Sequence, residues 1–199
     1  ERAVSNVPAS AAVIGKDGHR HFMAKEIHEQ PALAGVAVAA RLSADRRRIV
    51  SPAEAGDWAA AGRIALIGCG TAHYAGLVSK YWFERIARLP ADVEIASEWR
   101  YREPALAPGG VAVFVSQSGE TADTLAAMRH ARAAGQTTLA IVNVETSTMA
   151  READVVLPIL AGPEIGVAST KAFTAQLIAL LSTALLAARA RGALDAQCE

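Results

Sequence analysis

The sequence predicts an α/β fold, a three-layer α/β/α domain built on a five-stranded parallel sheet with flavodoxin-like topology. Short apolar runs alternate with longer segments of helical periodicity between residues 63 and 190. The runs are apolar along their whole length, as is typical of strands buried on both faces of a parallel sheet. Strands that alternate with helices form βαβ units with right-handed crossovers. A chain of 199 residues suits one well-buried domain and is too short for two large ones.

The first elements lie outside this alternation. Residues 1–20 are small and polar, lack periodicity and end in a glycine-flanked turn, so we interpret them as a linker or arm. A helix is predicted from Phe22, and we expect Pro31 to separate it from a second helix that ends near Leu42. A short helical segment that carries Trp58 should begin after Ser51.

The remaining elements follow in order along the chain. Strands are predicted at 63–68, 92–96, 111–115, 138–142 and 155–159. Helices are predicted at 72–89, 121–134, about 148–152 and about 170–190, and 97–102 is interpreted as a polar segment. Gly135 should end the second of these helices as a left-handed cap. The predicted domain spans 21–192, followed by a tail at 193–199.

Composition excludes several classes of function. The formal net charge is zero and no basic run is longer than three residues, so a nucleic-acid surface is not indicated. Two cysteines far apart, without CxxC spacing, suit a reducing cytoplasm, and the beginning of the chain shows no apolar signal region. The apolar stretch 172–190 contains Thr174, Gln176 and Ser182, which favours a buried helix over a membrane span. No membrane partner is therefore expected. The histidines show no metal-ligand spacing, so no metal is expected either.

The most informative junction is the one between strand 111–115 and the following helix. It consists of Ser116-Gln117-Ser118-Gly119-Glu120-Thr121. Free backbone N–H groups and the positive dipole end at a helix N-terminus favour an anion such as phosphate. The turn contains no Lys or Arg, so neutral donors would hold that anion. A plain helix cap in a tight turn is the alternative, but it would need only one Ser and one Gly.

A second polar turn, Gly68-Cys69-Gly70-Thr71, follows the first strand of the sheet. If the strand order is 2-1-3-4-5, this turn and the 116–121 turn face each other across one crevice at the topological switch point. The spacing of the glycines does not match a dinucleotide-binding fingerprint. Cys69 is either a nucleophile, for which the sequence specifies no base, or a buried thiol at the end of a strand.

The loop 162–171 is a candidate third wall of the crevice. Ser169 or Thr170 could cap the following helix, and Lys171 could meet an anion or be solvated or paired locally. No pair of carboxylates is placed by the sequence for acid–base work. Glu98, Arg100 and Arg102 form a charged cluster that suits a surface or a subunit interface.

Five motifs in order resemble the glutamine–fructose-6-phosphate aminotransferase (glucosamine-6-phosphate synthase) family. The resemblance spans about residues 20–190 and corresponds to the first of that family's two sugar-isomerase (SIS) domains. The motifs are His21-Phe22-Met23-Ala24-Lys25-Glu26-Ile27-His28-Glu29-Gln30-Pro31, Cys69-Gly70-Thr71, Ala96-Ser97-Glu98-Trp99-Arg100-Tyr101-Arg102, Ser116-Gln117-Ser118-Gly119-Glu120-Thr121-Ala122-Asp123-Thr124 and Glu164-Ile165-Gly166-Val167-Ala168-Ser169-Thr170-Lys171-Ala172-Phe173-Thr174.

The resemblance implies that fructose 6-phosphate binds at the strand ends. It implies phosphate contacts from Ser116, Gln117, Ser118 and Thr121, and sugar contacts from Cys69, Gly70, Thr71, Val167 and Ser169. The family commonly has Ser after Cys-Gly-Thr, whereas this chain has Ala72, which removes one hydroxyl. No cofactor is implied.

The family's enzymes make glucosamine 6-phosphate from fructose 6-phosphate and glutamine. An amino-terminal glutaminase domain supplies ammonia, and the second SIS domain supplies the main acid–base and lysine groups. This chain contains neither. We therefore expect this chain to bind hexose 6-phosphate but not to catalyse the reaction alone. We also expect it to form a homodimer and to be located in the cytoplasm.

Two other functions remain open at this stage. One is a related sugar-phosphate deaminase or ketose isomerase, and the other is a non-catalytic sugar-phosphate sensor. A helix-turn-helix segment would support the sensor, and the sequence shows none. The linker-like residues before His21 favour the synthase.

Overall fold

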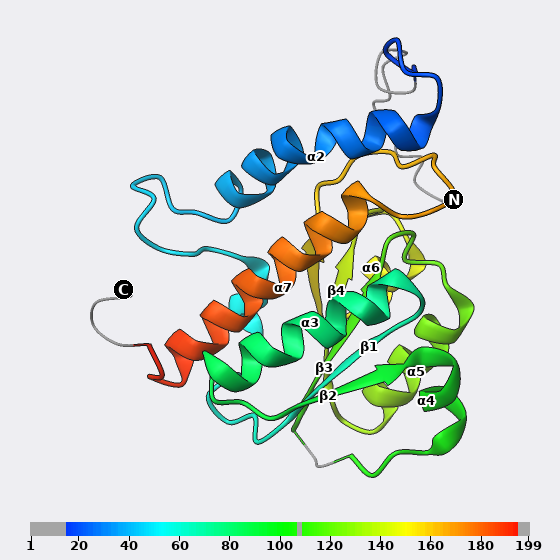
Figure 1. The fold of residues 1–199 in the computed structure, drawn as a ribbon. Helices are drawn as coiled ribbons and strands as arrows, with labels where there is room; N and C mark the ends of the chain where they lie inside the picture. The colour runs from blue at the N-terminus through cyan, green and yellow to red at the C-terminus, as the bar shows by residue number, and fades with distance from the viewer. Residues whose placement is uncertain (1–14, 107–108, 195–199) are drawn as a thin grey trace, which may run out of the picture.

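The computed structural model describes residues 15–106 and 109–194 (Figure 1). Its centre is a five-stranded parallel sheet in the order β2-β1-β3-β4-β5. The strands are β1 (Ile64–Gly68), β2 (Ala91–Ile95), β3 (Val111–Ser116), β4 (Thr137–Val142) and β5 (Val155–Pro158). The predicted fold class and the predicted strand order are both confirmed. Parts of the predicted arm at 1–20 and tail at 193–199 lie outside the described residues.

Helices cover both faces of this sheet. On one face lie α3 (Thr71–Arg85) and α7 (Lys171–Ala190), which pack side by side (Figure 1). The opposite face carries α4 (Ala96–Arg102), α5 (Ala122–Ala133) and α6 (Thr148–Glu152). The first described helix, α2 (Phe22–Ala39), packs against α7. These layers match the predicted three-layer arrangement.

The central strand β3 shows why its sequence is apolar throughout. Val111, Val113 and Val115 pack toward α3 and α7. Ala112 and Phe114 belong to the opposite core, with residues of α4 and α5. Because both faces of the sheet are covered, each side chain of β3 is buried whichever way it points.

The apolar core has two parts, one on each face of the sheet, and α7 is the main helix of the larger part. Within the described residues it alone is long and apolar enough to cross a membrane, and 67% of its apolar window is buried inside the domain. The prediction of a buried helix is therefore confirmed.

The predicted division of the first helix at Pro31 is wrong. α2 runs without interruption through Pro31. Proline cannot donate to the carbonyl of Ile27 four residues earlier, but the side chain of Gln30 donates to that carbonyl at 3.2 Å. This local replacement satisfies the acceptor that proline would otherwise leave without a partner.

Two further segments differ from their predictions. Only Pro52–Ala55 forms a short 3₁₀ helix, and Trp58 lies beyond it, with its indole N–H donating to the Ala53 carbonyl at 2.7 Å. The segment interpreted as polar is the helix α4, in which Ala96 and Trp99 are buried three residues apart. Its basic residues Arg100 and Arg102 form ion pairs within the chain, with Asp123 and Glu94. Because most residues of this short helix are polar or charged, the sequence does not show that one side of it is buried.

Candidate functional site

The two polar turns lie at neighbouring strand ends. β1 and β3 are adjacent, with Gly68 opposite Val115, so their carboxyl ends open onto the same side of the sheet. This is the topological switch point of the sheet, where open α/β folds bind ligands. A cavity of about 180 Å³ lies there, and it is lined by Cys69, Thr71, Ala72, Val115, Ser116, Gln117, Ser118, Thr121, Thr124 and Gln176.

Two serine side chains of the 116–121 turn accept hydrogen bonds from the backbone of the turn itself. The Gly119 N–H donates to Ser116 Oγ at 3.0 Å, and the Glu120 N–H donates to Ser118 Oγ at 3.1 Å. A serine oxygen that accepts a backbone hydrogen bond keeps its own O–H available as a donor. The Ser116 and Thr121 oxygens also lie 3.4 Å apart, so one of these two hydroxyls donates to the other. The turn therefore offers the remaining hydroxyl proton and that of Ser118 to a ligand while its backbone stays fixed.

The helices that begin at these two turns have uncapped N-termini. Thr121 is the N-cap of α5 and Gly70 is the N-cap of α3, and in the described part of the chain neither helix receives a side-chain cap hydrogen bond. Gly70 has φ of 56°, a left-handed value that glycine adopts without strain. Free N–H groups and the positive ends of two helix dipoles therefore flank the cavity, an arrangement that favours an anion.

Within residues 15–106 and 109–194, no Lys or Arg lines this cavity. The guanidinium of Arg100 lies at the first turn of α5, but it donates to Asp123 at 2.7 Å. An anion in the cavity would be bound by neutral donors, as the sequence of the turn predicts.

Cys69 is half-buried at the end of β1. Among the described residues, its Sγ atom has one hydrogen-bond partner, the Thr124 hydroxyl at 3.9 Å. A threonine hydroxyl cannot remove a thiol proton at neutral pH, so these contacts do not activate Cys69 as a nucleophile. The contact instead joins the first turn of α5 to the end of β1.

The loop 162–170 is fixed by two carboxylates. Glu164 accepts hydrogen bonds from the Ser169 hydroxyl at 3.1 Å and from the N–H groups of Thr170 and Ala172 at 2.9 and 3.1 Å. The buried carboxylate of Glu26 accepts from Ile165 N at 2.6 Å on the other side of the loop. Thr170 is the N-cap residue of α7, one of the two positions that the sequence offers, but its side chain makes no capping hydrogen bond within the described residues. The carboxylate of Glu164 accepts from the N–H groups at this helix end instead.

Lys171 points away from the cavity. Its buried Nζ donates to Glu29 of α2 at 2.7 Å, so local pairing is the correct alternative for this residue. Burial raises the pKa of Glu29, but hydrogen bonds and charges from Lys171 and Lys25 outweigh it and hold that pKa below its ordinary value.

The structure brings most of the predicted site residues together. Six of them line the cavity, and Gly70 is the N-cap beside it. Val167 and Ser169 do not line it, and Val167 is fully exposed, so their sugar contacts stay predictions.

Two polar residues of the cavity were missed from the sequence. Thr124 lies one helical turn after Thr121, and that spacing could have pointed to it. Gln176 comes from α7, about sixty residues away along the chain. Its only signal is an amide in the middle of an apolar helix.

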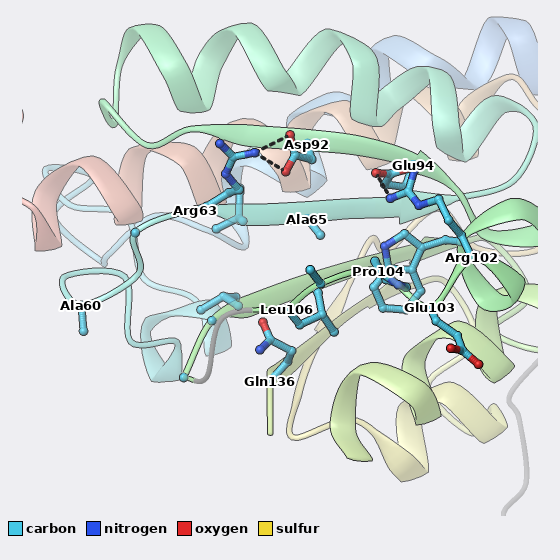
Figure 2. Close-up of a pocket in the computed structure, with 17 residues that line it drawn as sticks. Ala60, Arg63, Ala65, Asp92, Glu94, Arg102, Glu103, Pro104, Leu106 and Gln136 are labelled. Atoms are coloured by element: carbon cyan, nitrogen blue, oxygen red, sulfur yellow. Dashed lines mark hydrogen bonds and ion pairs between the residues drawn. The ribbon is translucent and has the colours of Figure 1, made fainter. Parts of the chain in front are cut away.

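A larger cavity, of about 630 Å³, lies near the amino ends of the strands (Figure 2). Four of the charged side chains on its wall form two ion pairs, Arg63 with Asp92 at 2.9 Å and Arg102 with Glu94 at 2.6 Å. No predicted site residue lines it. Its position and paired charges do not match the anion site that the strand-end turns form.

The chain was compared with known proteins. A model of the SIS domain family matches residues 59–186. The chain is 56% identical to a glutamine–fructose-6-phosphate aminotransferase (isomerizing) of Bradyrhizobium diazoefficiens, over 96% of this chain and 32% of that protein. It is 52% identical to the enzyme of the same name from Caulobacter vibrioides, over 98% of this chain and 32% of that protein.

Among solved structures, the C-terminal domain of glucosamine-fructose-6-phosphate aminotransferase from Francisella tularensis superposes with a TM-score of 0.87 at 42% identity. That match covers 92% of this chain and 51% of the other. Tagatose-6-phosphate ketose/aldose isomerase from Escherichia coli, at 19% identity and a TM-score of 0.69 over 89% of this chain and 49% of the other, shares the fold.

The curated relatives are named as enzymes, and the chain spans about a third of their length. The family match covers more than half of the chain and contains the whole sheet together with both polar turns. The chain belongs to the SIS domain family.

Proposed function

We propose that this chain is the first sugar-isomerase domain of a glutamine–fructose-6-phosphate aminotransferase and that it binds a hexose 6-phosphate. The observation that carries the proposal is the 116–121 turn, which presents hydroxyl donors beside the uncapped N-terminus of α5. The identity of more than 50% to enzymes of that name, across nearly the whole chain, supports the same substrate.

In this proposal Ser116, Gln117, Ser118 and Thr121 hold the phosphate. The sugar extends from it along Cys69, Gly70 and Thr71 toward the loop that carries Val167 and Ser169. The fixing of that loop by Glu26 and Glu164 supports a defined role for it at the edge of the site. Ala72 lines the cavity without a hydroxyl, so the backbone and Thr71 supply the polar contacts at the first turn of α3.

We also propose that the whole protein holds a glutaminase domain and a second SIS domain, and that it makes glucosamine 6-phosphate from fructose 6-phosphate and glutamine. The relatives are about three times as long as this chain and the Francisella domain is about twice as long. A homodimer in the cytoplasm completes the proposal, supported by the exposed apolar stripe of α3.

The alternative of a deaminase or ketose isomerase has weaker support. Glucosamine-6-phosphate deaminase from Thermotoga maritima is 23% identical with a TM-score of 0.66 over 89% of this chain and 51% of the other, so this likeness concerns the fold alone. The sensor alternative has no specific observation in its favour.

Calorimetric titration with fructose 6-phosphate tests the proposal. Ser118→Ala and Thr121→Val each remove a hydroxyl donor at the cavity, and a hydrogen bond to a charged group is worth about 1.5–3 kcal/mol. Affinity should fall by roughly one to two orders of magnitude in each variant. Fructose without its phosphate should bind far more weakly.

Ser97→Ala is the matched control, because Ser97 lies at the start of α4 and does not line the cavity. It should bind like the parent chain. Unchanged affinity in both Ser118→Ala and Thr121→Val would refute the phosphate assignment.

A further inference from the structure

Gln176 has an unsatisfied buried acceptor. The side chain is 1% exposed, lines the strand-end cavity and comes from the second turn of α7. Its Oε1 atom has no hydrogen-bond partner among the residues that the structure describes. A buried amide oxygen that loses its bonds to water destabilises the fold unless another donor replaces them.

Its neighbours on α7 make this acceptor unusual. Ser182 and Thr183 are also buried, and both donate to the Ala179 carbonyl, at 2.7 and 2.8 Å. The rest of the buried face of this helix is largely apolar, with Ala172, Ala175 and Ala179 close to Gln176 in sequence. The Gln176 amide is therefore an isolated polar group on a largely apolar part of the helix face, and its side chain lines the cavity.

The 116–121 turn, which also lines the cavity, supplies hydrogen-bond donors where Gln176 supplies an acceptor. Ser116, Ser118 and Thr121 present hydroxyls, and their serine oxygens already accept backbone hydrogen bonds. The turn suits an anion, whereas an amide oxygen repels phosphate oxygens and accepts from a hydroxyl. A ligand that satisfies both has a phosphate at one end and a hydroxyl group close to it.

We infer that Gln176 is a specificity-determining contact, whose Oε1 accepts a hydrogen bond from a hydroxyl on the carbon chain of the bound sugar phosphate. The inference rests on the proposed function and adds a residue to it. Gln176 then distinguishes a polyhydroxylated phosphate ester from phosphate alone, and it orients the ester with its carbon chain toward α7.

The test is calorimetric titration of the 199-residue chain with fructose 6-phosphate and, separately, with inorganic phosphate. Gln176→Met keeps the length of the side chain and removes the acceptor, and Gln176→Leu is a second variant of similar volume. In both, the dissociation constant for fructose 6-phosphate should rise about five- to tenfold, as expected for one neutral hydrogen bond. Affinity for inorganic phosphate should not change.

Thermal melting separates a binding role from a structural one. Because the variants remove an unsatisfied polar atom, their melting temperatures without ligand should be no lower than that of the parent chain. Gln136→Met, which changes a buried glutamine near the amino ends of the strands, is the matched control and should leave both affinities unchanged.

Equal loss of affinity for both ligands, no loss for either, or a lowered melting temperature with both affinities reduced would each overturn the inference. In all three cases the parent chain would still bind fructose 6-phosphate, so the proposed function would stand. A parent chain that binds neither ligand would overturn the proposed function, and this inference with it.

Discussion

Gly119 determines the shape of the 116–121 turn more than any other single residue. Its φ of +65° lies in the left-handed region, and a Cβ atom there would lie 2.1 Å from Ser147 Oγ. Ser147 cannot move freely, because that oxygen accepts from Ala150 N as the cap of α6. Glycine is therefore required both by the backbone and by the neighbouring helix.

Gly119→Ala should lower the free energy of unfolding by about 2–3 kcal/mol, the sum of a left-handed alanine and a disturbed helix cap. Binding of fructose 6-phosphate should fall as well, because the displaced turn carries the phosphate donors. Urea denaturation measures the first effect and calorimetry the second.

Gly135→Ala is the control for that variant. Gly135 has φ of +77°, but an added Cβ would meet no atom of the described residues within 4 Å. It should show the backbone penalty alone, about 1–2 kcal/mol, with no change in binding. Equal destabilisation by the two variants would contradict the role assigned to Ser147.

At the site, local chemistry was predictable from the sequence and long-range placement was only partly so. The hydroxyl-rich turn and the glycines at the end of β1 follow directly from the residues of strand–turn–helix junctions. The sequence does not show that Gln176 of α7 reaches the same cavity. That contact depends on how the helix packs on the sheet, which periodicity does not specify.

At the scale of elements, α2 is joined to α7 by a partly buried ionic contact. Glu29 of α2 accepts from Lys171 of α7 at 2.7 Å and lies 3.4 Å from Lys25. One turn along, the Thr174 hydroxyl donates to the Gln30 side chain at 2.5 Å. Because Glu26 of the same helix also accepts hydrogen bonds from the 162–170 loop, α2 fixes both the start of α7 and the loop that precedes it.

This contact predicts a dependence of stability on pH. The folded state holds the pKa of Glu29 below its ordinary value of 4.5, so the stabilisation is present above that value and is lost as the pH falls through the folded pKa. Glu29→Gln should lower stability at pH 7 and should show a smaller further loss than the parent when the pH is lowered to about 3.

Urea denaturation at several pH values measures this difference. Glu145→Gln, at an exposed glutamate of the loop before α6, should follow the parent chain throughout. A Glu29→Gln curve parallel to that of the parent would show that the ion pair does not contribute to acid sensitivity.

Helix ends and interruptions were the least predictable elements. Pro31 is a strong local signal for a break, yet Gln30 supplies the donor that lets α2 continue. The helix α4 was hidden because one buried tryptophan and one alanine anchor an otherwise charged segment. In both cases a side-chain interaction outweighs the tendency of the local sequence.

At the scale of the whole molecule, α3 is apolar on two sides. Phe83 is buried in the core, while Tyr74, Leu77, Val78 and Tyr81 form an exposed stripe at helical spacing. Sedimentation velocity should show that the chain self-associates through this stripe, and Tyr74→Glu with Tyr81→Glu should shift it toward the monomer.

Tyr101→Glu is the control for that shift. Tyr101 is an equally exposed tyrosine, but it lies on α4, on the opposite face of the sheet. It should leave the association unchanged. A parent chain that remains monomeric at high concentration would refute the prediction.

The last prediction concerns catalysis by this chain alone. Amination of fructose 6-phosphate needs ring opening, attack by ammonia and proton transfer between adjacent carbons, and hence a positioned acid–base group. Glu120 and Glu164 are carboxylates of the described strand-end loops, and both already accept hydrogen bonds. The Thr148 N–H donates to Glu120 at 2.6 Å and holds the pKa of that carboxyl below its ordinary value. Glu164 caps α7.

A carboxylate stabilised in its charged form is a poor proton acceptor at neutral pH. We therefore expect no measurable glucosamine 6-phosphate from fructose 6-phosphate with glutamine or ammonia, even at high concentrations of the chain. Product analysis by mass spectrometry checks this. Activity that persists through purification and disappears in Glu120→Gln or Glu164→Gln would contradict it, because a residue assigned here to holding the backbone would then be transferring the proton.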